Sequence, residues 1–195
     1  MKKAQLLERL DQLSACEGAV AWVRRYDGSP SQMWAKCNRA DWMLWLAAKA
    51  DVDRKTIVTI ACLCARRALK YVKQGDKRPL VAIKTAEAWV AGKEMIKQVR
   101  AASYASYTAA TSYAADAADA ADAAAAYAAY ASYAAYAADA AAAATSYAAD
   151  AAGPSKTKEL KIMSKIVRKH IKWSDVAKGL EAAKWNQRKD CEANQ

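Results

Sequence analysis

The residue types best suited to binding a ligand are concentrated in one short stretch of the first half of the chain. Trp34, Trp42 and Trp45 supply three aromatic rings, and Arg39 and Asp41 supply a cation and a carboxylate. A tryptophan ring can stack on a planar or cationic group, and a guanidinium can bind a phosphate. A helix that begins here would add backbone N–H groups that favour an anion. The same residues could instead form an ordinary core, with Asp41 capping the helix and pairing with Arg39.

A second group of cations surrounds another expected helix start, at Pro79. Arg78 precedes this proline and Lys84 follows it by five positions. If the fold brought the two helix starts together, the rings could stack on a base while the cations and helix amides bound phosphate. The candidate ligand- or partner-binding residues are therefore Trp34, Arg39, Asp41, Trp42, Trp45, Arg78 and Lys84.

Motifs for catalysis and metal binding are missing from the sequence. His170 is the only histidine, and no neighbouring residue is placed to orient it for nucleophilic catalysis. Cys62 and Cys64 are separated by one residue, which does not match the usual spacing of zinc or redox cysteines. No Walker loop, dinucleotide-binding glycine motif, HExxH or EF-hand is present. The sequence predicts a protein that is not an enzyme and has no catalytic residues, cofactor or metal.

Charge and compartment signals favour an anionic partner for a cytoplasmic protein. The net charge is +11, with basic segments on either side of an acidic, lysine-free segment at 101–152. The sequence starts without the apolar segment of a signal peptide and has no stretch typical of a membrane span. Five irregularly spaced cysteines are typical of reduced thiols. A basic surface could attract an acidic protein or another anion, or the charges could simply neutralise one another in the fold.

Helix starts are well marked in the first hundred residues. Ser14 with Glu17, and Ser29 with Gln32, match the capping-box pattern. Further starts are expected after Asn38, at Asp53 and at Pro79. The expected helices cover 2–13, 15–26, 30–36, 39–50, 54–73 and 79–91.

The segment 101–152 consists mainly of Ala, with Tyr, Asp, Ser and Thr, and repeats TSYAADAA at 111–118 and 145–152. Ala is the best helix former, so the segment is predicted to be helical. One continuous helix would be longer than a compact chain of this size, so we expect two or three closely packed Ala/Tyr-rich helices. The breaks are expected at the Thr-Ser pairs at 111–112 and 145–146 and at Ser132.

The C-terminal segment is predicted to contain a basic amphipathic helix. Leu160, Met163, Ile166, Val167 and His170 share one face. The opposite face is formed by Lys158, Lys161, Lys165, Lys169 and Lys172. Together the patterns predict an all-α fold, a compact multi-helix domain with three regions: a basic Trp-rich region at 1–100, Ala/Tyr/Asp-rich helices at 101–152 and basic helices at 153–195.

Several of these motifs resemble a widespread bacterial and phage family. They are Ala15-Cys16-Glu17, the run from Trp34 to Leu46 with its Asp-Trp-x-x-Trp-Leu core, Ala61-Cys62, Ala65-Arg66, and the helix from Arg78-Pro79 to Trp89. The resemblance spans about residues 15 to 171. The family comprises Ala-rich immunity proteins associated with polymorphic toxin systems. The resemblance implies neutralisation of a harmful agent by binding, with no catalytic residues to carry over.

Three functional hypotheses follow from the sequence. The leading one is a non-enzymatic inhibitor, for immunity or phage anti-defence, that binds a toxin or host-defence protein through its basic helical surface. The alternative is a sponge that sequesters an anionic, nucleotide-like immune messenger. Nucleic-acid binding is the weakest, because the acidic 101–152 segment would repel a polyanion. No membrane partner is expected, and oligomerisation stays open.

Overall fold

The computed structural model describes residues 1–72, 74–110, 123–124, 126–129, 131 and 137–182. This part of the chain is helical and contains no strand, which confirms the all-α prediction. The helices are α1 (Lys3–Gln12), α2 (Glu17–Arg25), α3 (Pro30–Lys36), α4 (Ala40–Lys49), α5 (Arg54–Arg66), α6 (Arg78–Val90), α7 (Ile96–Ala110), α9 (Ala137–Asp150), α10 (Lys156–His170) and α11 (Trp173–Ala182), with short 3₁₀ turns at Leu69–Tyr71 and Gly153–Ser155.

Two of the expected N-caps are confirmed by their hydrogen bonds. The Gln32 amide donates to Ser29 Oγ at 3.3 Å, and the Ser29 amide donates to Gln32 Oε1 at 2.8 Å. The Thr56 amide donates to Asp53 Oδ2 at 2.9 Å. These bonds satisfy N–H groups that have no partner within α3 and α5, so local sequence determines where both helices begin.

The expected cap at Ser14 is wrong, because Ser14 ends one helix instead of starting the next. Its φ of 55° places it in the left-handed region just after α1. The Ser14 amide donates to the Asp11 carbonyl at 2.9 Å, and the Ala15 amide donates to the Leu10 carbonyl at 2.8 Å. This pair of bonds is a Schellman motif, which satisfies the last carbonyls of α1. Helix α2 then begins after Cys16.

Two further expectations also need correction. Helix α4 begins after Arg39 without a side-chain cap, so Asn38 does not cap it. Helix α5 ends at Arg66, short of the expected position 73. The amides of Arg67 and Ala68 donate to carbonyls three residues earlier, so the chain tightens out of the α-helix before the 3₁₀ turn.

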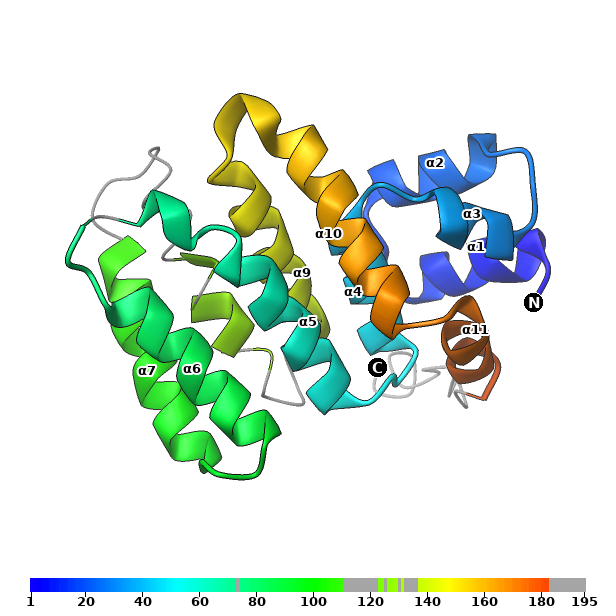
Figure 1. Cartoon of the computed structure of the whole chain (residues 1–195). Helices are drawn as coiled ribbons and strands as arrows, with labels where there is room; N and C mark the ends of the chain where they lie inside the picture. Colours follow the sequence, from blue (N-terminus) through cyan, green and yellow to red (C-terminus); the bar gives the residue numbers. More distant parts are fainter. Residues whose placement is uncertain (73, 111–122, 125, 130, 132–136, 183–195) are drawn as a thin grey trace, which may run out of the picture.

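The Ala-rich helix α9 forms the centre of the fold. It packs against α4, α5 and α10 (Figure 1). Ala141, Ala144 and Ala149 are fully buried, and their small side chains let the neighbouring backbones approach closely. Helix α6 lies beside α5 and α7 lies beside α6, while α1–α3 and α11 lie at the other end of the molecule (Figure 1). Elements from all three predicted regions therefore contact one another, and α7 crosses the expected boundary at residue 100.

The expected break at Thr145-Ser146 is wrong, because α9 continues through it. Thr145 is buried and its Oγ1 donates to the Ala141 carbonyl at 2.9 Å, within the same helix. The hydroxyl is thus satisfied by the preceding turn and does not cap a new helix. The other two expected breaks, at 111–112 and at 132, lie outside the described residues.

Helix α10 has the predicted amphipathic character, with one exception. Leu160, Met163 and Val167 are buried and Ile166 is half-buried. His170 is exposed instead of packed, and its Nδ1 lies 2.9 Å from the Ile166 carbonyl oxygen. The five predicted lysines, Lys158, Lys161, Lys165, Lys169 and Lys172, are all exposed.

An ion pair between the half-buried Arg67 and the buried Glu159 joins α10 to the end of α5. Arg67 Nε donates to Glu159 Oε2 at 2.7 Å, and Glu159 is buried. This hydrogen bond lowers the pKa of Glu159 below its ordinary value of 4.5. A carboxylate with a lowered pKa stabilises the fold fully above its ordinary pKa, and this stabilisation is lost as the pH falls through the lowered value.

We therefore expect Glu159→Gln to reduce the free energy of unfolding by about 1–3 kcal/mol near neutral pH. The difference from the unmodified chain should shrink as the pH falls below 4.5, because the carboxylate becomes protonated there. Chemical denaturation at a series of pH values measures this. Glu94→Gln, at an exposed position, is the control. A difference that does not change with pH would contradict a role for the charge.

Candidate ligand cavity

A cavity of about 480 Å³ lies where α1–α4 meet α9 and α11. Its walls are mostly apolar and contain five of the seven tryptophans, Trp22, Trp34, Trp42, Trp45 and Trp173. The remaining walls are formed by Leu6, Leu10, Ser14, Ala15, Cys16, Ala19, Val23, Pro30, Met33, Cys37, Arg39, Asp41, Met43, Leu46, Ala142, Ala143 and Ser146.

The charged part of the cavity wall is an ion pair at the start of α4. Arg39 Nε and Nη2 donate to the two carboxylate oxygens of Asp41 at 2.9 and 2.6 Å. Asp41 is only 7% exposed, and its hydrogen bond to the guanidinium raises the pKa of Arg39. The Arg39 guanidinium carbon lies 4.1 Å from the centre of the Trp42 ring, which is a cation–π contact. The pair is neutral overall, and it holds the Trp42 ring in place.

Trp45 is oriented by a residue of the Ala-rich helix. Its Nε1 donates to Asp139 Oδ1 at 2.9 Å. The Lys49 ammonium lies 3.8 Å from Asp139 Oδ2 and 5.6 Å from the centre of the Trp45 ring. These exposed contacts contribute little to stability, but they restrict the orientation of the Trp45 ring, which lines the cavity.

Trp34 contacts Trp173 of α11, with ring centres 6.0 Å apart and the planes tilted by 44°. Trp34 is 7% exposed, and its Nε1 has no hydrogen-bond partner among the described residues. A buried donor without a partner is uncommon and costs about 1–3 kcal/mol. Core packing alone therefore does not explain why this N–H group is buried without an acceptor.

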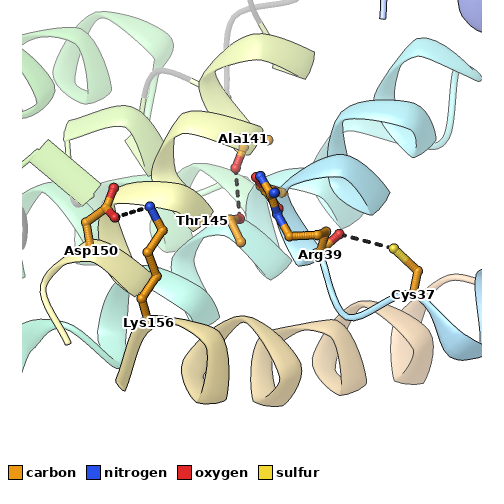
Figure 2. Close-up of polar contacts among 7 residues, drawn as sticks. Cys37, Arg39, Ala141, Thr145, Asp150 and Lys156 are labelled. Atoms are coloured by element: carbon orange, nitrogen blue, oxygen red, sulfur yellow. Dashed lines mark hydrogen bonds and ion pairs between the residues drawn. The ribbon is translucent and has the colours of Figure 1, made fainter. Parts of the chain in front are cut away.

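Arg168 of α10 holds the turn between α3 and α4 behind the cavity. Its Nη1 donates to the Cys37 carbonyl at 2.6 Å, and its Nη2 donates to Ser164 Oγ at 3.0 Å. Burial lowers the pKa of Arg168. Cys37 in the same turn approaches the Arg39 carbonyl, with its Sγ at 3.7 Å (Figure 2). Arg168 thus positions the segment that carries Arg39.

The structure gathers five of the seven predicted site residues. Trp34, Arg39, Asp41, Trp42 and Trp45 all line the cavity. The remaining two, Arg78 and Lys84, do not line it. Arg78 pairs with Asp76 before α6, and Lys84 is exposed on that helix. The two helix starts considered from the sequence therefore do not form one site.

Sequence reasoning missed the residues that distant helices contribute. Trp22, Trp173 and Ser146 line the cavity from α2, α11 and α9. For Trp22 and Trp173, the aromatic residue type was a sequence signal that they could belong to the same site as the other tryptophans. Arg168 had no comparable signal, since it lies in a lysine-rich helix where a cation is expected to be exposed.

Thiol positions do not suggest metal or redox chemistry. Cys37, Cys62 and Cys64 are buried, and burial raises the pKa of all three, that of Cys64 to about 12. Cys16 is exposed at the cavity wall. In the described part of the chain, no group of His, Cys, Asp and Glu side chains could hold a metal ion.

The helices described here include none with the length and apolar character needed to span a membrane.

A family model described as Imm-5 like putative immunity protein matches residues 48–175. The chain belongs to this family. The match confirms the resemblance noted from the sequence, although it begins at residue 48 and not near residue 15. It covers α5–α10 and Trp173 but not the Trp34 to Leu46 run. No curated protein and no solved structure matches the chain.

Proposed function

We propose that this immunity-family protein neutralises a toxin by binding it, without catalysis. The observation that carries the proposal is the family match over residues 48–175. The only histidine supports a non-catalytic role, because His170 is exposed and lies against a carbonyl of its own helix. A host-defence protein is an alternative partner that the same mode of binding would serve.

The proposed contact surface is the basic face of α10, formed by Lys158, Lys161, Lys165 and Lys169, together with Lys172 just beyond the end of the helix. All five side chains are exposed, and none forms an ion pair with a described residue. The part of this face on α10, from Lys158 to Lys169, is about 17 Å long, from the helical rise of 1.5 Å per residue. A row of unpaired cations of this length on a chain of net charge +11 favours an acidic partner.

Sequestration of a nucleotide-like messenger is the second candidate function. The observation in its favour is that three of the predicted tryptophans and Arg39 meet at one cavity. The cavity offers less to the phosphate groups, because Arg39 is engaged with Asp41 and the cations at 78 and 84 lie elsewhere.

Co-expression with inducible toxin domains of bacterial polymorphic toxin systems tests the first proposal. We expect the chain to restore growth against an acidic toxin domain and to co-purify with it, more completely at low than at high salt. A parallel panel of host-defence proteins tests the alternative partner. No protection against any member of either panel would contradict the proposed function.

A further inference from the structure

We propose that the tryptophan-lined cavity binds a small, planar aromatic ligand that carries no net charge, such as a neutral heterocycle. This site is separate from the proposed toxin surface, since no α10 lysine lines the cavity. The inference does not depend on toxin binding.

The volume and the wall chemistry are those of a small-molecule site. A volume of about 480 Å³ lies within the usual range of ligand pockets, about 300–1,000 Å³. Such pockets are mainly apolar and aromatic, with a few polar groups that orient the ligand. Here those groups are the Arg39–Asp41 pair and the hydroxyls of Ser14 and Ser146, which form no hydrogen bond with a described residue.

Two of the aromatic walls, Trp42 and Trp45, are held in place by polar contacts before any ligand binds, which favours a planar ligand. The Trp42 ring is held by a cation–π contact with the Arg39 guanidinium, and the Trp45 ring is held by its hydrogen bond to Asp139. Trp34 contacts the Trp173 ring of a separate helix. The Trp42 and Trp45 rings, which these polar contacts hold, lose little conformational freedom when they stack on a flat group, whereas Trp34 has a ring contact only.

The electrostatics of the wall favour a neutral ligand over a phosphate. Arg39 is the only cation among the described residues that line the cavity, and it donates to both carboxylate oxygens of Asp41, at 2.9 and 2.6 Å. A phosphate that displaced Asp41 would leave a carboxylate that is only 7% exposed without its partner. A neutral ring leaves the pair intact and stacks beside it.

The unpartnered Nε1 of Trp34 is an independent observation at the same site. This donor belongs to a cavity-lining ring and is buried without an acceptor among the described residues. A ring nitrogen or carbonyl of a ligand would supply that acceptor after a small rotation of the indole. The ligand class is therefore a heterocycle with a hydrogen-bond acceptor and not a hydrocarbon.

Tryptophan fluorescence and calorimetry with a defined panel test the proposal. The panel contains neutral purines and pterins, the nucleoside adenosine, adenosine monophosphate and a cyclic dinucleotide. We expect saturable binding of at least one neutral ring, with no gain in affinity from added phosphate. We expect Trp42→Ala to weaken that binding about tenfold or more through loss of stacking, and Trp89→Ala, at a half-buried tryptophan outside the cavity, to leave it unchanged.

Protection of Cys16 provides a readout that needs no cavity variant. In a Cys191→Ser chain, a thiol reagent should modify Cys16 first, because the thiols of Cys37, Cys62 and Cys64 are buried. A neutral ring that binds in the cavity should slow this modification. The proposal is overturned if no neutral ring binds and protects Cys16, or if only the phosphorylated members of the panel do so.

Discussion

Replacing Gly179 with alanine is expected to detach α11 from the rest of the fold. A Cβ atom at this position would lie 1.7 Å from the carbonyl oxygen of Ala50 and 2.8 Å from its carbon. Ala50 is a buried residue at the end of α4, and a backbone carbonyl cannot rotate away as a side chain can. The helix must move as a unit, so we expect a loss of about 3 kcal/mol or more in the free energy of unfolding.

Gly18→Ala is the matched control for this substitution. A Cβ atom at Gly18 would make an ordinary contact, 3.4 Å from the Trp42 ring. Alanine is favoured over glycine inside a helix by about 1 kcal/mol, so this variant should be as stable as the unmodified chain or more stable. Chemical denaturation compares the two variants. Equal stability of both would show that α11 does not pack on α4 as described.

Reversing the charge of three residues on the basic face of α10 is expected to abolish partner binding. The substitutions are Lys161→Glu, Lys165→Glu and Lys169→Glu. Placing like charges against an acidic partner costs several kcal/mol, so affinity should fall about 100-fold or more. The fold should survive, because all three side chains are exposed and form no ion pair with a described residue. Affinity is measured by titration against the toxin domain that the chain neutralises.

The control carries the same change of charge on another surface. Lys84→Glu, Lys93→Glu and Lys97→Glu alter exposed lysines at or near α6 and α7. We expect this variant to lose only the modest part of the affinity that comes from net charge. If both variants bound equally well, the basic face of α10 would not be the contact surface.

Local chemistry made some elements of the fold predictable and others not. Ser29 and Asp53 cap the helices that follow them, because each cap depends on bonds within four residues. Ser14 and Thr145 also carry hydroxyls but cap no helix that follows. The backbone of Ser14 closes the end of α1 in a left-handed conformation, and the Thr145 hydroxyl donates to the preceding turn of its own helix, α9. Which role a short polar side chain takes depends on where the adjacent helix stops, and tertiary packing decides that.

The central position of α9 could not be predicted from its composition. Ala content predicts a helix, but it does not say which helices pack against it. The structure shows that α4, α5 and α10 do so, because small side chains allow close contact on several sides of one helix. The sequence therefore predicted that this segment forms a closely packed helix, but it did not predict that the helix packs against α4, α5 and α10.

The candidate site was predictable only where its residues are close in sequence. Trp34, Arg39 and Trp42 lie within nine positions, so two short helices and one turn bring them together. Trp173 reaches the cavity only because α10 and α11 fold back onto α3 and α4. Arg78, like Arg39, is a cation at the start of a helix, but it does not line the cavity. Residue types alone do not show that these two helix starts lie apart in the fold.

Titration of the purified chain with a purified toxin domain that it neutralises in cells tests the central claim most directly. Binding without catalysis should give a stoichiometric complex, from which denaturation releases the toxin chemically unchanged. The affinity should fall steeply as salt is raised and should be lost in the variant with three reversed charges on α10. Protection of cells without a detectable complex, or recovery of a modified or cleaved toxin, would contradict the account.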